Sequence, residues 1–424
     1  MSVSDAGLAD RKSRMQQIYG SMGQLEKLLK IFSLDSKERK ITTGEKRWYI
    51  FKCILSVSLF TVLVIVTTSY KIRNVYPSLN VSIALTDFVQ NIFDNIQYII
   101  DLFFVYKYGK EISIEYYRQY ECFDEIMNVN YYSEIKKRVA VLIGVFFFFW
   151  LISSAFDIVA WYLGYDLLVP LVFAPAYVFL FIKILTNLDI SAHVMNIECR
   201  LRIIGDIVQE TCIKTEDLPM NTSVKSGFID AVSNKHWFYS EGNNRCSGMR
   251  LRLQPLKSVT SSQDMKLLSR CYLLLSEQCM YINSVFGVRI LLNSLSLLID
   301  MVRFLNVVVR IAVGSQQTVY NAGYFPAAST LCRFLVCVCV LASLVRHCEL
   351  AYRQQERLLS VADHILVNKK PDDSLRSGIQ ELRALVVSRP VRFNMAYFFT
   401  LNYSFLVSIA SVVVTYTIIL LQSL

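Results

Sequence analysis

Polar and charged side chains line one face of an otherwise apolar segment at residues 81–106. Carboxylates and amides recur there at steps of three and four residues, which gather them on one face of an α-helix: Asp87, Gln90, Asp94, Gln97 and Asp101. Asn91 and Asn95 widen the same face. Such groups bind cations, hydroxyl groups or partner side chains. An ionisable group inside a membrane is costly and faces protein or water, so this face should be functional, structural or both.

A second apolar segment, 284–313, carries complementary groups near one face: Arg289, Asn293, Ser296, Asp300, Arg303 and Arg310. The two predicted helices run in opposite directions, and seven residues of helix rise about 10 Å. The spacing therefore predicts two pairs one above the other: Asp87 with Arg310, and Asp94 with Arg303.

These residues allow two compatible interpretations. Buried ion pairs would hold the helices together, whereas the outer part of the polar faces would line a water-filled pocket for a polar ligand. Residues Asp157, Trp161 and Tyr162, at the end of another predicted helix, and Arg333 would complete that pocket. The predicted ligand-binding residues are Asp87, Gln90, Asn91, Asp94, Asp157, Trp161, Arg303 and Arg310.

Helices that cross a membrane must position these groups. The chain has 424 residues, of which 54% are hydrophobic and 18% charged, far from the soluble average in both respects. Apolar stretches long enough to span a bilayer lie at about 48–70, 81–106, 139–162, 167–190, 284–313, 325–346 and 396–424. The sequence thus predicts an all-α, polytopic membrane protein with seven transmembrane helices. The polar start of the chain predicts no cleaved signal peptide.

Lysine and arginine predict the orientation. The segment before the first span and every second connection after it hold 34 of these residues, whereas the other connections hold only Lys71 and Arg73. By the positive-inside rule the N-terminus is cytoplasmic, and an odd number of spans places Leu424 outside. The net charge of +10 belongs to these cytoplasmic faces. A nucleic-acid partner is disfavoured, because no basic stripe alternates with exposed aromatic residues.

The cytoplasmic connections contain predicted helices. Residues 188–210 continue the fourth span as an amphipathic helix, and 372–390 form a second one whose apolar face repeats Leu375, Ile379, Leu382 and Val386. That face packs either within one subunit or between subunits. The predicted organisation is a cytoplasmic segment 1–47, six spans with the outer pocket at 48–346, cytoplasmic anchor helices at 347–395 and a last helix at 396–424. Within the segment 48–346, the cytoplasmic loop 213–262 is polar and predicted to be disordered.

Enzymatic and metal-binding motifs are missing from the sequence. It has no phosphate-binding glycine loop, no nucleophile elbow and no clustered metal-ligand spacing among its four histidines. We therefore predict no enzyme, no metal and no cofactor. The cysteines avoid the short outer loops, so an extracellular disulfide framework is not expected. Asn80, in the sequon Asn80-Val81-Ser82, is a candidate glycosylation site close to the membrane.

The last predicted helix carries a stripe at steps of three and four residues: Ser404, Ser408, Ser411, Thr415, Ile418 and Gln422. Small residues at this spacing favour close packing of helices. They would equally suit a pore wall, where hydroxyls replace part of the hydration shell of an ion. One helix cannot enclose a pore, but copies around a symmetry axis can, which would require an oligomer.

The ending "TYTIILLQ", Thr415 to Gln422, resembles the terminal signature of insect gustatory receptors: Thr-Tyr, five largely hydrophobic residues, Gln and usually Phe. The preceding "AYFFTLNYSFLVSIASVVV" is similar to the segment that leads into that helix in the same family. In the motif, Thr415, Tyr416 and Gln422 hold the family positions, whereas Thr417 is a mild departure and Ser423 replaces the usual Phe.

The resemblance implies a tetrameric, ligand-gated, non-selective cation channel in the cell membrane of a sensory neuron. Four last helices would form the pore, and each subunit would hold a tastant pocket in its outer half. The residues implied for the pore and gate are Gln422, Ser423, Leu421, Ile418, Thr415 and Ser411. The partners implied are a small-molecule tastant, membrane lipids, and identical or related subunits in a homotetramer or hetero-tetramer.

Three functional alternatives remain at this point. A homotetrameric receptor opened by a tastant is preferred, with a bitter-type ligand slightly favoured over a sugar because the terminal motif diverges from its common form. A receptor subunit or co-receptor that works only with a partner is the second. A G-protein-coupled receptor is disfavoured, because it would need the N-terminus outside, against the charge distribution.

Overall fold

The computed structural model describes residues 28–29, 31, 43–127, 132–164, 168–214, 262–314, 323–369 and 371–422. Most of the predicted segment 1–47, residues 215–261 of the predicted disordered loop, Ser423 and Leu424 lie outside the described residues. The helices are α2 (Thr43–Asn74), η1 (Tyr76–Ser78), α3 (Val81–Met127), α4 (Tyr132–Gly164), α5 (Leu168–Val172), α6 (Ala174–Lys214), α7 (Ser262–Ala312), α8 (Phe325–Asn368), α9 (Asp373–Ser388) and α10 (Tyr403–Gln422). Two short strands, β1 (Asn394–Met395) and β2 (Phe399–Thr400), pair antiparallel.

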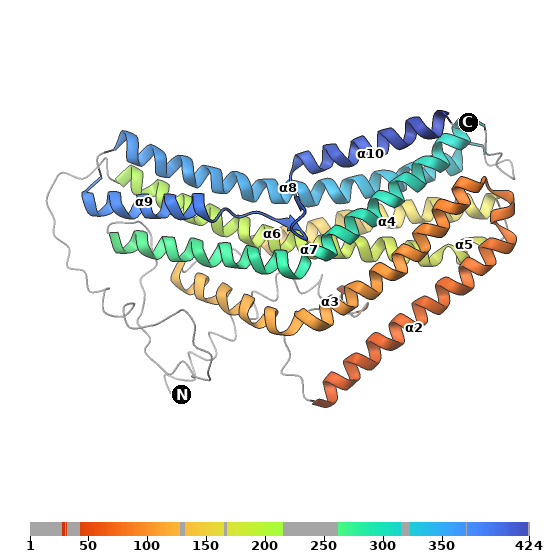
Figure 1. Ribbon diagram of the computed structural model, residues 1–424, viewed down its shortest axis with the longest axis horizontal. Coiled ribbons are helices and arrows are strands. Elements are labelled where there is room, and N and C mark those ends of the chain that lie inside the picture. Colours follow the sequence, from red (N-terminus) through yellow and green to blue (C-terminus); the bar gives the residue numbers. More distant parts are fainter. Residues whose placement is uncertain are drawn as a thin grey trace.

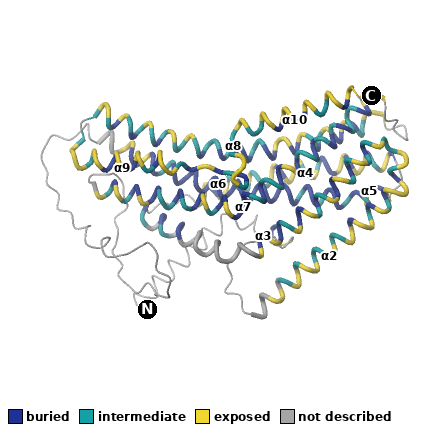
Figure 2. Tube along the Cα trace, viewed as in Figure 1, coloured by how far each residue is buried: buried dark blue, intermediate teal, exposed yellow. Residues whose placement is uncertain are grey.

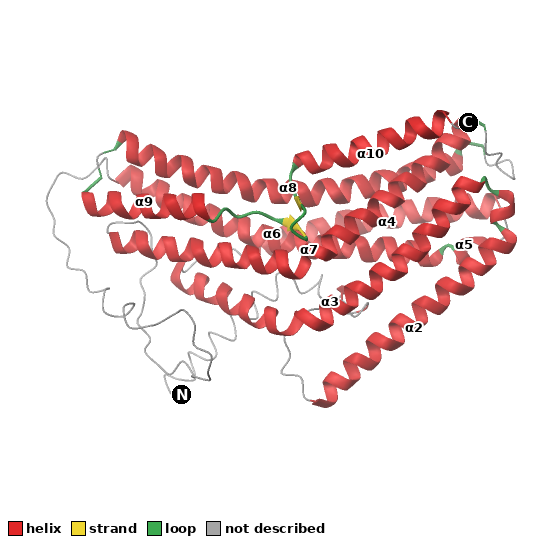
Figure 3. Cartoon of the chain, in the orientation of Figure 1, coloured by secondary structure: helices red, strands yellow, loops and turns green. Residues whose placement is uncertain are grey.

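The long helices lie side by side in one elongated bundle (Figures 1 and 3). In the described part of the chain, six of them are long and apolar enough to cross a membrane: α2, α4, α6, α7, α8 and α10. The remaining predicted span, 81–106, lies in α3, whose polar face lowers its mean hydropathy. The all-α prediction is confirmed, with the β1–β2 hairpin as a small addition.

Burial divides the helices into central and peripheral ones (Figure 2). In the most apolar stretch of α6, 89% of the residues are buried within the subunit. In the corresponding stretches of α2 and α10, only 6% and 11% of the residues are buried. Apolar side chains exposed over such areas indicate lipid or other subunits as neighbours. The packing of α3 against α7 and of α6 against α8 forms the centre of the bundle.

The half of the bundle that lacks α2, α4 and α10 is the predicted cytoplasmic part, where α6, α7, α8 and α9 lie together (Figure 1). The predicted continuation of the fourth span is confirmed, since Ile190, Val194, Ile197, Leu201 and Ile204 are all fully buried in α6. They belong to one apolar core with residues of α7, α8 and α9. This half therefore folds as a compact helical unit of its own subunit.

The amphipathic helix α9 uses its apolar face within the subunit. Ile379 and Leu382 are fully buried and Val386 nearly so, in a core with α7 and α8. Of the two sequence-based interpretations, packing of this face within one subunit is the one that the structure shows. The sequence could not decide, because an apolar face requires a partner without specifying which chain supplies it.

Two predicted helices differ from their expected bounds. The fourth span is interrupted at Phe173, between α5 and α6, next to Pro170 and Pro175. Proline lacks a backbone N–H and breaks the hydrogen-bond ladder. The last helix begins at Tyr403 rather than at residue 396, because the β1–β2 hairpin precedes it. Ala396 and Tyr397, in the turn of that hairpin, have φ of 49° and 64°, values that a helix does not admit.

Candidate functional site

The polar faces of α3 and α7 meet inside the bundle, as the sequence predicts, but in a different register. Asp87 pairs with Arg303 at 2.6 Å and Asp101 with Arg289 at 3.2 Å. Between them, Ser296 donates to Asp94 at 2.7 Å and Gln97 donates to Asn293 at 3.0 Å. The predicted pairs Asp87–Arg310 and Asp94–Arg303 are therefore wrong by seven residues along α7.

Lys183 of α6 takes the place that Arg303 was expected to fill. Its ammonium lies 2.7 Å from the Asp94 carboxylate and 2.5 Å from the Asp300 carboxylate. Gln90 also donates to Asp94, at 2.6 Å. Lys183 is 2% exposed, and sequence reasoning missed it. The signal was available: Lys183 is the only basic residue within the fourth predicted span, and a charge inside an apolar helix requires a buried partner.

Asp87 is the centre of a second cluster, nearer the end of the bundle where α2 is followed by α3. It accepts from Arg303, from Lys71 at 3.0 Å, from the Tyr76 hydroxyl at 2.8 Å and from Asn91 at 3.2 Å. The sequence analysis assigned Lys71 to an outer connection. In the structure Lys71 belongs to α2, is 1% exposed, and lies with its ammonium 3.9 Å from the centre of the Phe173 ring.

A third cluster surrounds Asp157 of α4. The carboxylate pairs with Arg333 of α8 at 2.8 Å and accepts from Tyr177 of α6 at 2.9 Å and from the Trp161 indole at 3.2 Å. Trp161 stacks on Phe173, with ring centres 4.1 Å apart. The structure thus brings together Asp157, Trp161 and Arg333, as predicted for the pocket, whereas Tyr162 is 55% exposed.

The remaining predicted pocket residue, Arg310, lies two helical turns after Arg303, near the C-terminal end of α7. It donates to Asn306 at 3.0 Å, and Asn306 is bonded to Ser82 at the start of α3. Seven of the eight predicted ligand-binding residues are buried, and Trp161 is half-buried. Apart from Arg310, they lie in the three clusters around Asp94, Asp87 and Asp157, which include residues from α2 to α8.

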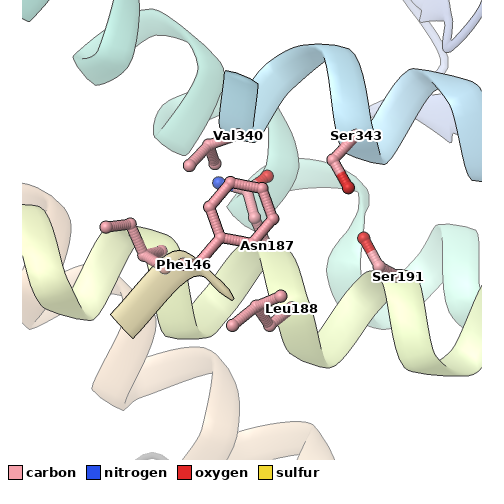
Figure 4. Close-up of a pocket in the computed structure, with 7 residues that line it drawn as sticks. Phe146, Asn187, Leu188, Ser191, Val340 and Ser343 are labelled. Atoms are coloured by element: carbon pink, nitrogen blue, oxygen red, sulfur yellow. The ribbon is translucent and has the colours of Figure 1, made fainter. Parts of the chain in front are cut away.

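A separate crevice lies deeper in the bundle, between α4, α6 and α8 (Figure 4). Its lining residues include Phe146, Asn187 and Leu188, and the hydroxyls of Ser191 and Ser343 face each other across it. The crevice has about 160 Å³ of space between atoms, but it is too narrow to admit a water molecule. None of its lining residues belongs to the three clusters, and it offers no room for a ligand.

The last helix, α10, packs against α7 and α8 along one narrow face formed by Ile409, Val413 and Leu420, with Tyr416 half-buried on the same side. At 100° per residue, the predicted stripe lies on the opposite side. All of its members are exposed: Ser404, Ser408, Ser411, Thr415, Ile418 and Gln422. Leu421 is 52% exposed.

The chain between α9 and α10 is fastened to α7 and α8. Asn283 of α7 donates to the Arg392 carbonyl at 2.7 Å and accepts from the Asn394 amide at 2.9 Å. Gly287 of α7 permits this approach, since a Cβ there would lie 3.0 Å from the Ala396 nitrogen. No sequence pattern predicts these contacts, which connect the segment after α9 to α7 just before α10 begins.

The chain matches a known protein family in sequence and a known structure in fold. The 7tm Chemosensory receptor family matches residues 27–423. The fold is similar to that of the insect olfactory receptor OR5 from Machilis hrabei in complex with eugenol, with a TM-score of 0.57, 15% identity, and coverage of 96% of this chain and 100% of that chain. A second structure of the same receptor gives a TM-score of 0.55 and 14% identity, with coverage of 95% of this chain and 98% of that chain.

No curated protein matches the chain in sequence. The similarity to OR5 is too low in identity to show more than a shared fold, which is that of a seven-helix receptor. The family match extends over nearly the whole chain, including the three polar clusters and α10. The chain therefore belongs to the 7tm chemosensory receptor family, the group of insect olfactory and gustatory receptors.

Proposed function

We propose that this chain is a gustatory receptor subunit that forms a ligand-gated, non-selective cation channel in the cell membrane of a sensory neuron. The observation that carries the proposal is the uncovered α10: an apolar helix of 20 residues whose most apolar stretch is only 11% buried within its own subunit. Four of the six residues in its exposed stripe carry hydroxyl groups, with which lipid tails cannot form hydrogen bonds.

Four copies of the subunit around one axis would turn this stripe inward. Ser404, Ser408, Ser411 and Thr415 would then line a wet wall. Weak oxygen ligands suit a non-selective pore, because they replace water without holding the ion. Ile418, Leu421 and Gln422, at the far end, would form the gate. The copies are identical in a homotetramer or include related receptors in a hetero-tetramer.

The ligand would act at the outer clusters. The Asp94 cluster is fully engaged by Lys183, Gln90 and Ser296, which supports a structural role. The Asp157 cluster combines a carboxylate with stacked aromatic rings, Trp161 and Phe173, which suits a small ligand that is largely apolar. This composition supports a bitter-type tastant over a sugar. OR5, the structural relative, was solved with eugenol, also a small molecule.

The gate provides the most direct test. Gln422→Ala removes the amide at the end of the exposed stripe, so we expect basal whole-cell cation current to rise several-fold or ion selectivity to change. Val412→Ala is the matched control, since Val412 is 49% exposed but points about 90° away from the stripe. Ser423→Phe, which restores the usual aromatic residue of the motif, should lower basal current by raising the barrier to wetting of the gate.

Currents are compared at equal surface expression. The proposal fails if wild type, Gln422→Ala and Ser423→Phe give indistinguishable basal and ligand-evoked currents. Quinine and sucrose are suitable probes for the evoked current, one representing each ligand class.

A further inference from the structure

The exposed stripe of α10 carries hydroxyls but no charge: between Tyr403 and Gln422 the helix contains no acidic or basic residue. The backbone adds an unfavourable field for cations, because the N-terminus of a helix has the equivalent of about half a positive charge. In the predicted orientation this end of α10 is the inner mouth of the proposed pore. A preference for cations must therefore come from a charge on another element.

Glu349 of α8 supplies a carboxylate at this position. Its Oε1 accepts a hydrogen bond at 3.0 Å from the backbone nitrogen of Tyr403, the first residue of α10. Tyr403 directly precedes Ser404, where the exposed stripe begins. A second acceptor, the Asn402 side chain, takes the amide of Phe405 at 3.1 Å. The capping of the helix therefore does not depend on Glu349 alone.

The charge of Glu349 is not used in a salt bridge. In the described part of the chain, the salt bridges of α8 involve Arg333, Arg357 and Asp363, and none involves Glu349. The side chain is half-buried, so it remains partly open to water. Exposed Arg346 and Arg353 lie about one turn away on either side, whereas Glu349 hydrogen-bonds to the first residue of α10.

We propose that Glu349 is the charge-selectivity residue of the channel. Its carboxylate cancels the positive end of the α10 dipole, and four copies around the axis would form an acidic ring that concentrates cations at the inner mouth. This inference rests on the proposed function and adds a named selectivity determinant to it.

The alternative role for Glu349 is that of a helix cap only. Glu349→Gln separates the two roles, because the amide oxygen keeps the hydrogen-bond acceptor while the negative charge is lost. Glu356→Gln is the matched control: it removes a carboxylate from an exposed position of α8, two turns further from α10.

The test is the reversal potential of the basal current in full-length receptors, with NaCl as the only salt on both sides of the membrane and the external NaCl diluted tenfold. For wild type and Glu356→Gln we expect a reversal potential close to that of sodium. Glu349→Gln should shift it toward the chloride value, with a several-fold loss of the sodium-to-chloride permeability ratio. An unchanged ratio in Glu349→Gln overturns the inference, whereas a wild type that passes no current overturns the proposed function and the inference with it.

A variant that fails to reach the surface does not end the test. Arg346→Glu leaves the cap intact and replaces a positive charge with a carboxylate one turn from Glu349. If charge at this mouth sets selectivity, Arg346→Glu must raise the sodium-to-chloride permeability ratio. A ratio equal to that of wild type contradicts the inference.

Discussion

At the scale of single residues, Lys183 holds the centre of the membrane half together. Its ammonium bridges Asp94 of α3 and Asp300 of α7, and Asp300 in turn pairs with Arg303 at 3.1 Å. Three helices are thereby joined by one positive charge that is shielded from water. Removing one member of a buried ion pair is strongly destabilising, because it leaves the partner charge without compensation.

Lys183→Met should therefore lower stability by about 3–5 kcal/mol. We expect a lower melting temperature of the detergent-solubilised protein and reduced surface expression. Adding Asp94→Asn to this variant should restore part of the lost stability, because it removes the carboxylate left without Lys183. The other partner of Lys183, Asp300, keeps its ion pair with Arg303. Lys137→Met, which removes an exposed lysine of α4, is the control. Equal melting temperatures for Lys183→Met and Lys137→Met would show that the bridge contributes nothing.

The Asp157 cluster and the Asp94 cluster make different predictions about the ligand. Trp161→Ala should weaken the response to quinine while surface expression stays near wild type, because half-buried Trp161 contributes apolar contact area more than it supports the fold. Asp94→Asn should instead reduce surface expression, because Asp94 is held by Lys183 in the core. Dose–response curves at matched surface expression decide this. If neither variant changes the curve, the pocket lies elsewhere.

At the scale of elements, α9 has two unlike faces. Its apolar face is buried against α7 and α8, while Val387 on the other side is 58% exposed. The hairpin that follows places Ala396 and Tyr397 in the left-handed region, which costs roughly 1–2 kcal/mol for each such residue. The hydrogen bonds from Asn283 maintain this conformation. The anchor helices and α10 are thus connected by a short, tightly held segment.

Leu382→Asp should prevent folding rather than only disrupt assembly, because it places a charge in a fully buried position of the subunit core. We expect loss of the monodisperse peak in size-exclusion chromatography. Val387→Asp, an equivalent change on the exposed face of the same helix, should retain a folded protein. A monodisperse Leu382→Asp protein of reduced mass would instead support a role of this face between subunits.

At the scale of the whole molecule, burial is uneven. The central helix α6 is covered on nearly all sides, whereas α2, α4 and α10 expose large apolar side chains. Lipid can cover α2 and α4, which carry apolar residues on their outer surfaces. The stripe of hydroxyls on α10 is different, since it gains little from lipid and more from water or neighbouring copies. Closed symmetric assembly is the common solution to such a surface.

We expect the detergent-solubilised receptor to have the mass of a tetramer, measured by light scattering with the detergent contribution subtracted. Each subunit contributes 48.8 kDa. Because α10 would lie at the axis, Ser408→Trp should reduce the tetramer by crowding that axis, while Val412→Trp should be tolerated. A wild type that is monomeric at micromolar concentration contradicts the channel mechanism.

Much of the architecture follows from the sequence by itself. The apolar runs predicted the helices. The spacing of three and four residues predicted the polar faces of α3 and α7 and the exposed stripe of α10. Such patterns succeed because helical periodicity is local: it determines which side chains share a face whatever surrounds the helix. The terminal motif added the family before any contact was known.

Only the tertiary structure decided the register and the partners. Shifting α7 by seven residues, two helical turns, still presents its polar face to α3, so periodicity alone cannot distinguish Asp87–Arg303 from Asp87–Arg310. The choice depends on how neighbouring helices pack, and here α6 contributes Lys183 between Asp94 and Asp300. The same reason explains α9: its spacing specified an apolar face, but only packing against α7 and α8 showed that the subunit itself covers that face.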